Sequence, residues 1–339
     1  MSIRATLERW NIDPYLIALV SMVALASVFP VRGQAAVDFS HATTIIIGLL
    51  FFLYGARLSR EAIVQGLSHW RLHTVILAST FVLFPLLGLG FRVLTPDVLP
   101  VPLYMGLLLV CTLPSTVQSS IAFTSIAGGN VPAAVCAASA SSLLGIFITP
   151  LLVALLMRAH GGMSFGAIEG IIEQLLLPFL AGQVARQWIG GFLSRHKGLT
   201  GLVDRGSILL IVYGAFSEGV VHGIWHQVDW QSLLAVGVAN AALLALVLTI
   251  TTFASRRLGF SRADEITIVF CGSKKSLAAG IPIVNVLFPA NSVGVMLLPL
   301  ILFHQIQLMV CATLARRYAA QAQDSSRRLA DSGGVAVVR

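Results

Sequence analysis

QSLLAVGVANAALLALVLTITTFA, residues 231–254, contains no charged side chain. A helix of this length extends for about 36 Å, which is enough to cross a hydrocarbon core of about 30 Å. We place comparable apolar stretches near residues 12–30, 39–57, 72–92, 102–127, 131–157, 165–186, 206–224, 231–254, 265–287 and 293–315. The sequence therefore predicts an all-α polytopic membrane protein of about ten transmembrane helices.

The composition supports a membrane location. Of the 339 residues, 57% are hydrophobic and only 11% are charged, whereas soluble domains carry roughly 25% charged residues. The short alternating segments of a β-barrel are not visible. The stretch near 12–30 lacks the small-residue cleavage site of a signal peptide, and we interpret it as the first span.

The basic residues predict an orientation. With a cytoplasmic N-terminus, almost all of the 22 Lys and Arg residues lie on the cytoplasmic side. Only Arg32, Arg92 and Arg158 lie opposite, and Lys274 and Lys275 lie inside a span. This bias follows the positive-inside rule and predicts that both termini are cytoplasmic. The net charge of +8 thus reports orientation, and we expect no nucleic acid partner.

The two halves of the chain repeat their landmarks at an offset of about 160 residues. The pairs are Tyr54-Gly55-Ala56 with Tyr213-Gly214-Ala215, Trp70 with Trp230, Cys111 with Cys271, and Asn130 with Asn291. Five spans per copy is an odd number, so the second copy must be inverted in the bilayer, as in many secondary transporters. We expect one repeat in residues 1–160, the other in residues 161–318, and a disordered cytoplasmic tail in residues 319–339.

Two spans are interrupted by polar residues at their middle. One contains LPSTVQSS at 113–120, where a proline removes a backbone donor, and the other contains CGSKKS at 271–276, with Gly280 and Pro282 following. Non-helical backbone at this depth is tolerated only inside the protein or beside an aqueous cavity. The interruptions predict a substrate or ion site that contains Ser115, Thr116, Gln118, Ser119, Ser120, Ser273, Lys274, Lys275 and Ser276.

The two adjacent lysines are the most costly residues of this site. A charge at the bilayer centre costs at least roughly 2.5–3.5 kcal/mol, so we expect a function for one of them. Neighbours on a helix point about 100° apart, and the other lysine would neutralise the negative C-terminal ends of the interrupted helices. For the serines and the proline, helix packing is the structural alternative.

Polar residues in two other spans are further candidates. Glu218 is either an acid in the cavity or a residue at the wet end of its span. His304 and Gln307 lie on one face of the last span, where they either line the cavity or hydrogen-bond between helices.

Enzymatic chemistry finds little support in the sequence. There is no nucleotide fingerprint and no cluster of metal ligands, so we expect a non-enzyme without a cofactor. The four cysteines suggest neither disulfides nor a metal site. A Ser/Lys hydrolase built on Ser273 and Lys275 is conceivable, but it would not explain the matched interruptions.

Several ordered motifs resemble the bile acid:sodium symporter superfamily, in particular the member-seven branch of solute carrier family 10 and its bacterial relatives. The resemblance covers nearly all ten spans. It is carried by Phe51-Phe52 with Gly55 and Leu58, Trp70-Arg71-Leu72-His73, Pro114 with Val117, Ser119 and Ser120, Gly128-Gly129-Asn130, Ile148-Thr149-Pro150-Leu151-Leu152, Phe270-Cys271 with Lys275-Ser276-Leu277, Gly280-Ile281-Pro282, and His304.

The resemblance implies a panel of helices 1, 2, 6 and 7 and a core of helices 3, 4, 5, 8, 9 and 10, with broken helices 4 and 9 crossing. In sodium-coupled relatives, a Ser-Asn pair and a glutamate near the crossing bind sodium. Ser119 and Ser120 are similar to the pair, whereas residues 266–299 contain no Asp or Glu. The better match of Lys275 to the family favours it over Lys274 as the functional lysine.

These observations support a secondary transporter of the bacterial inner membrane that moves a small organic anion, either sodium-independent or proton-linked. One alternative is a sodium-coupled symporter of the family type. Another, which the resemblance implies, is a membrane regulator of calcium handling without transport of its own. The sequence does not specify the substrate, the coupling ion or the oligomeric state.

Overall fold

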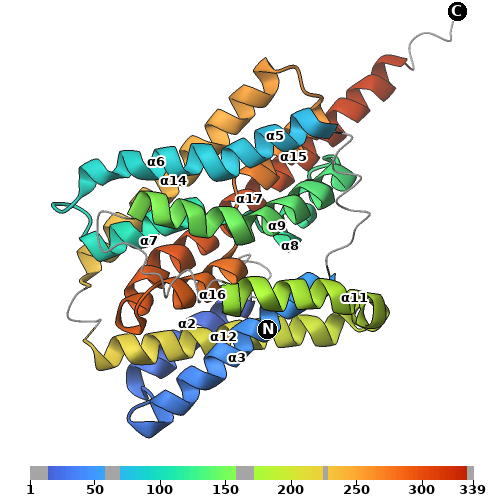
Figure 1. Ribbon diagram of the computed structural model, residues 1–339. Coiled ribbons are helices and arrows are strands. Elements are labelled where there is room, and N and C mark those ends of the chain that lie inside the picture. The colour runs from blue at the N-terminus through green and yellow to red at the C-terminus, as the bar shows by residue number, and fades with distance from the viewer. Residues whose placement is uncertain (1–13, 58–68, 158–171, 224–227, 334–339) are drawn as a thin grey trace, which may run out of the picture.

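The computed structural model describes residues 14–57, 69–157, 172–223 and 228–333, and within these ranges it contains helices and no strand (Figure 1). The first half consists of α2 (Pro14–Val28), α3 (Gln34–Arg57), α5 (Trp70–Ala78), the π-helical turn η2 (Ser79–Leu83), α6 (Phe84–Gly90), the 3₁₀ turn η3 (Phe91–Leu94), α7 (Val101–Thr112), α8 (Gln118–Ile126) and α9 (Val131–Met157).

The second half contains the π-helical turn η5 (Ile172–Leu176), α11 (Leu177–Arg195), α12 (Lys197–Val221), α14 (Trp230–Arg257), α15 (Arg262–Gly272), α16 (Leu277–Leu287) and α17 (Ala290–Gly333). Part of the span expected near 165–186 lies outside the described residues, because residues 158–171 are not among them.

Seven of the described segments are long and apolar enough to cross a membrane. They are Gln34–Arg57, Trp70–Leu94, Val131–Met157, Gly198–Val221, Trp230–Arg257, Arg262–Leu287 and Ala290–Ala322, and Ile17–Val28 and Val101–Thr112 are shorter apolar helices. The prediction of an all-helical, multi-pass membrane protein is confirmed.

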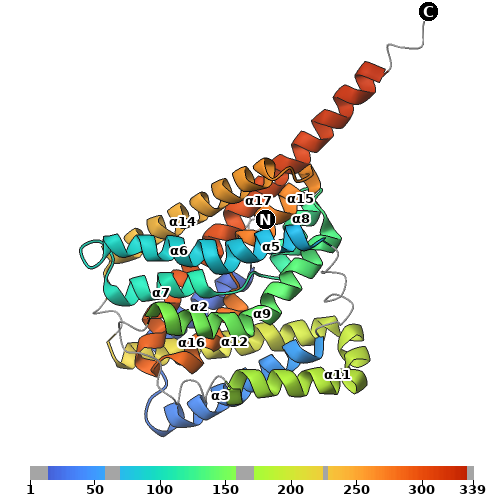
Figure 2. The ribbon, with the colours of Figure 1, turned by 45° about the horizontal axis from the view of Figure 1, so that its top comes forward.

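The helices form two groups (Figures 1 and 2). Helices α2, α3, α11 and α12 make one layer, in which α3 packs along α11 and α12 packs along α2. The remaining helices form a larger bundle, most of which lies above this layer in Figure 1, and α12 joins the two groups through its contacts with α16 and α17. We call these groups the four-helix layer and the bundle.

The layer depends on glycines where α3 crosses α11. A Cβ atom at Gly55 would overlap the carbonyl of Phe179, and one at Gly182 would overlap the carbonyl of Phe52. The two backbones approach this closely because neither glycine has a side chain.

Residues 319–333 fall within the tail that we expected to be disordered, and they form the end of α17. Helix α17 continues to Gly333 and extends away from the bundle (Figure 1). Alanine is the most frequent residue of this segment and favours helix, and no glycine or proline occurs after Pro299 until Gly333. Polarity argues against burial of this segment, but it does not argue against a helix.

Candidate functional site

The predicted break in the first half of the chain separates α7 from α8. Helix α7 ends at Thr112 because Pro114 cannot donate a backbone hydrogen bond. The amide of Ser115 leaves the helical pattern and donates to Ser141 Oγ of α9 at 3.0 Å. Helix α8 then begins at Gln118.

The matching break separates α15 from α16. Helix α15 ends at Gly272, and Ser276 caps α16 by accepting the amide of Ala279 at 3.1 Å. The amide of Ser276 donates to the carbonyl of Pro114 at 2.9 Å. Both predicted breaks are therefore present, and their backbones contact each other directly.

The ammonium of Lys275 lies at this crossing and is fully buried. Its Nζ donates to the carbonyls of Thr80 at 2.7 Å, Leu113 at 2.7 Å and Cys111 at 2.9 Å. An ammonium has three donors, so these contacts use all of them. The ring centroid of Phe84 lies 4.1 Å from Nζ and adds a cation–π contact.

Local sequence explains why the Thr80 carbonyl is available. In the π-helical turn, the amide of Phe84 donates to Ser79 five residues earlier. The same pattern would pair Thr80 with residue 85, but this residue is Pro85 and has no N–H. The carbonyl of Thr80 therefore has no donor in its own helix and accepts from Lys275.

The backbone carbonyls at the end of α7 also accept hydrogen bonds from outside their own helix. The carbonyl of Cys111 would pair with the amide of Ser115, which instead bonds to Ser141. Thr149 of α9 donates to the carbonyl of Thr112 at 2.8 Å. Lys275 thus places its amino group at the negative end of α7, where the dipole favours a cation.

The last backbone carbonyls of α15 accept hydrogen bonds from serine hydroxyl groups. Ser79 donates to the carbonyl of Gly272 at 2.9 Å, Ser115 to that of Cys271 at 2.7 Å, and Ser120 to that of Phe270 at 3.4 Å. Ser115 and Ser120 therefore hold the crossing together, which was the packing alternative for these serines. Thr116 Oγ1 lies 2.6 Å from Ser119 Oγ and 3.2 Å from Ser120 Oγ.

Lys274 is also fully buried but is held more weakly than Lys275. Its Nζ lies 3.5 Å from the carbonyl of Ser119 and 3.7 Å from the ring centroid of Phe123. The ring of Phe270 lies 5.9 Å away. Lys274 thus has one long hydrogen bond and aromatic neighbours, an arrangement that leaves donor capacity for another acceptor.

Gln307 of α17 fixes the backbone of the break. Its Oε1 accepts the amide of Lys275 at 2.9 Å, and its Nε2 donates to the carbonyl of the same residue at 2.9 Å. Nε2 also lies 3.0 Å from His304 Nδ1. These contacts follow the interhelical alternative for Gln307.

The other candidates occupy different environments. Gln118, at the start of α8, is exposed, and Ser273 is buried within the second break. Glu218 lies in the four-helix layer, pairs with His222 at 3.5 Å, and lines a small pocket of about 70 Å³ with Ser40 and Asn285. The contacts recorded for the described residues do not connect Glu218 with the crossing.

Sequence reasoning missed two sets of residues that form hydrogen bonds at the crossing. The first is the pair Ser79 and Thr80, for which Pro85 was the available signal. The second is Thr149, whose hydroxyl was not considered because it lies in an apolar span. Among the described residues, no group of three or more His, Cys, Asp or Glu side chains is placed to hold a metal ion.

Comparison with known proteins gives consistent relatives. The chain is 58% identical over 323 residues to an uncharacterized protein, PA2026, of Pseudomonas aeruginosa. This alignment covers 94% of this chain and 97% of the relative. It is 58% identical over 313 residues to an Escherichia coli protein named "Putative symporter YfeH", covering 92% and 94%. It is 28% identical over 315 residues to a Xenopus laevis protein named sodium/bile acid cotransporter 7-A, covering 91% and 92%.

A family model agrees with these matches. The model of the SBF-like CPA transporter family matches residues 13–320, which is nearly the whole chain. The resemblance to the bile acid:sodium symporter superfamily is thereby confirmed. The protein belongs to the SBF-like CPA transporter family.

Proposed function

We propose that the protein is a secondary active transporter of a small organic anion, in which the ammonium of Lys275 takes the place of a coupling sodium ion at the helix crossing. The observation that carries this proposal is the set of three backbone carbonyls around Nζ. The family supports the transporter class, as do the names of two relatives, a putative symporter and a sodium/bile acid cotransporter.

An ammonium at this position disfavours sodium for two reasons. It occupies carbonyl oxygens of the kind that bind hard cations. It also repels a second cation, by about 4 kcal/mol for unit charges 4 Å apart at an effective dielectric constant of 20. Lys275 has no unused donor for a substrate, so we assign it the role of a fixed cation rather than that of a direct anion ligand.

An anionic substrate fits the remaining charges. Helices α8 and α16 begin at the crossing, and their N-terminal ends carry partial positive charge. Gln118 at the first turn of α8 is exposed, so that end is accessible from outside the protein. The ammonium of Lys274 lies beside Ser119 in the same turn and adds a full positive charge. We therefore assign contact with the anion to the exposed Gln118 and, after the conformational change that uncovers its buried ammonium, to Lys274.

The transport cycle that we propose uses the two helix groups. The four-helix layer corresponds to the panel and the bundle to the core, and rocking of one against the other exposes the crossing alternately to each side. We propose ten spans in two inverted repeats, with both termini in the cytoplasm. A lysine that loses its proton during the cycle would make the transport proton-linked.

The inverted topology predicts opposite labelling of two matched asparagines. Asn130 lies beside the start of α15, where its amide donates to Ala263 at 3.1 Å and its side chain to Asp264 at 2.9 Å. In right-side-out vesicles, a cysteine at Asn291 should react with a membrane-impermeant maleimide, whereas one at Asn130 should react only after permeabilisation. The parent should lack the four buried native cysteines. Reaction of both positions from the same side would exclude the inverted repeat.

The coupling proposal predicts that sodium has no effect. Purified protein should unfold at the same temperature in millimolar sodium chloride and in potassium chloride, because Lys275 occupies the cation position. A panel of carboxylates and sulfonates, with taurocholate as a steroid member, should contain anions that raise the unfolding temperature in either salt.

Reconstituted protein alone should exchange the labelled form of such an anion. Stabilisation by sodium would instead support the sodium-coupled symporter. Exchange that requires an added membrane protein would support the regulatory alternative. Lys274→Met should abolish the thermal shift caused by the anion. Glu218→Gln, in the four-helix layer, should retain this shift.

A further inference from the structure

A groove on the bundle is separate from the crossing. It lies between α14 and α17, has a volume of about 800 Å³, and is open along its length. Its walls include Ala245, Phe253 and Arg256 of α14 and Met309, Val310 and Arg317 of α17. In both views α14 lies on the side of the bundle away from the four-helix layer (Figure 2).

Most of the groove is apolar and faces outward. Phe253, Met309 and Val310 are exposed although they are large and hydrophobic. The threonines do not demand a polar ligand, because Thr249 donates to Ala245, Thr252 to Leu248 and Thr313 to Met309 within their own helices. This surface is suited to contact with an acyl chain.

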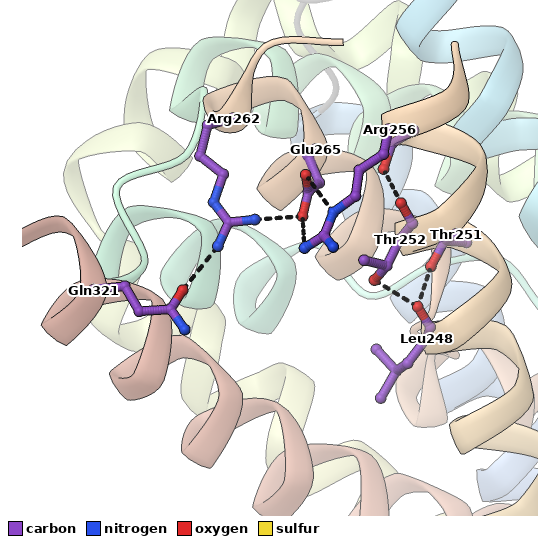
Figure 3. Close-up of polar contacts among 8 residues, drawn as sticks. Leu248, Thr251, Thr252, Arg256, Arg262, Glu265 and Gln321 are labelled. Carbon is purple, nitrogen blue, oxygen red and sulfur yellow. Dashed lines mark hydrogen bonds and ion pairs between the residues drawn. The ribbon is translucent and has the colours of Figure 1, made fainter. Parts of the chain in front are cut away.

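One end of the groove is strongly basic. Arg256 and Arg317 lie at this end, and both are exposed. Glu265, which is 4% exposed, holds Arg256 through Nε and Nη2 at 3.1 Å each (Figure 3). These contacts use two of the five N–H donors of the guanidinium and leave the others for an acceptor.

The charge at this end remains positive after its ion pairs are counted. Glu265 also binds Arg262, which reaches Gln321 of α17 (Figure 3). The guanidinium carbon of Arg262 lies 4.6 Å from the ring centroid of Tyr318. A single carboxylate thus pairs with two arginines, and Arg317 adds a further positive charge to the same groove. An anion at this end would contribute the missing negative charge.

The length of the groove matches one leaflet of a bilayer. From Ala245 to Arg256, α14 rises about 16 Å, close to half of a hydrocarbon core of about 30 Å. Trp230 begins α14 and is exposed, as expected for an aromatic residue at the opposite interface. Arg256 therefore lies at headgroup level while the apolar walls lie at acyl-chain depth.

We propose that this groove binds a phospholipid with an anionic headgroup, whose phosphate contacts Arg256 and Arg317 and whose acyl chain lies between α14 and α17. With the termini in the cytoplasm, the lipid belongs to the cytoplasmic leaflet. The groove is formed by the bundle alone, so lipid binding does not depend on the identity of the transported substrate.

The test measures lipid retention by the purified full-length protein with native mass spectrometry. Dioleoyl-phosphatidylglycerol should bind in preference to dioleoyl-phosphatidylcholine, which has the same chains. Arg317→Gln should weaken phosphatidylglycerol binding about fivefold, the ratio that corresponds to about 1 kcal/mol for one basic residue near the membrane surface. Arg195 is an exposed arginine of α11 in the four-helix layer, and Arg195→Gln should leave lipid binding unchanged.

A second variant tests the acyl-chain part of the groove. Ala245→Trp should reduce binding of both lipids, because the indole fills the deep end without altering charge. Equal binding of the two lipids, or equal effects of Arg317→Gln and Arg195→Gln, would overturn the proposal. Displacement of phosphatidylglycerol by millimolar inorganic phosphate would also overturn it, because the ligand would then be a free anion.

Discussion

Replacing Lys275 by methionine is expected to cost the protein several kcal/mol of stability. Methionine has a similar length but no donor. Three buried carbonyls, those of Thr80, Cys111 and Leu113, would lose their partner, at about 1–3 kcal/mol for each group. This loss is a large part of the roughly 5–15 kcal/mol by which a native protein is stable. Thermal unfolding of the detergent-purified protein measures it.

Lys274→Met is the matched control. Lys274 is as deeply buried as Lys275, but the Nζ of Lys274 makes one long hydrogen bond, at 3.5 Å, and otherwise faces aromatic rings. Methionine preserves contact with aromatic rings, so this variant should lose less stability. Equal unfolding temperatures of the two variants would show that the carbonyls around Lys275 do not matter.

A smaller substitution distinguishes a cation site from a general packing defect. Lys275→Ala removes the ammonium and leaves space beside the same three carbonyls. If this position takes a cation, millimolar ammonium or sodium chloride should raise the unfolding temperature of Lys275→Ala and leave that of the native protein unchanged. A variant that responds to neither salt would contradict the role of Lys275 as a substitute for a cation.

The sequence predicted the two helix interruptions because their signals are local, whereas the crossing of the two broken helices was implied by the family resemblance. Pro114 lies in the middle of an apolar span, and the two lysines lie about 160 residues later, inside another span. Each of these features is costly in a membrane unless the backbone is interrupted and buried there. The helical class and the site of interruption therefore followed from residue types and their spacing.

The partners of Lys275 could not be predicted in the same way. Its acceptor Thr80 is 195 residues away in sequence, and its availability depends on a π-helical turn. Pro85 marks a lost donor, but it does not specify which carbonyl remains unpaired or what approaches it. Glu265 was missed for a similar reason, because its burial between two arginines results from the packing of α15 against α14.

The second large effect is expected in the four-helix layer, at Gly182. In Gly182→Ala, the added methyl group would overlap the carbonyl of Phe52, which belongs to a helical backbone and cannot rotate away as a side chain could. Helices α3 and α11 would have to separate, and we expect a loss of about 3 kcal/mol or more. Gly201→Ala in α12 is the control, because its Cβ would meet no atom within 4 Å. That change should be neutral or stabilising by up to about 1 kcal/mol.

Gly55→Ala tests whether the two glycines act together, because Gly55 makes the reciprocal contact with Phe179. Once α3 and α11 have separated to accept one methyl group, the second meets less resistance. The double variant should therefore lose less stability than the sum of the two single losses. Strict additivity would indicate two independent local clashes and would contradict a shared close approach. The layer lies apart from the crossing, so the salt response of Lys275→Ala should persist when Gly182→Ala is added to it.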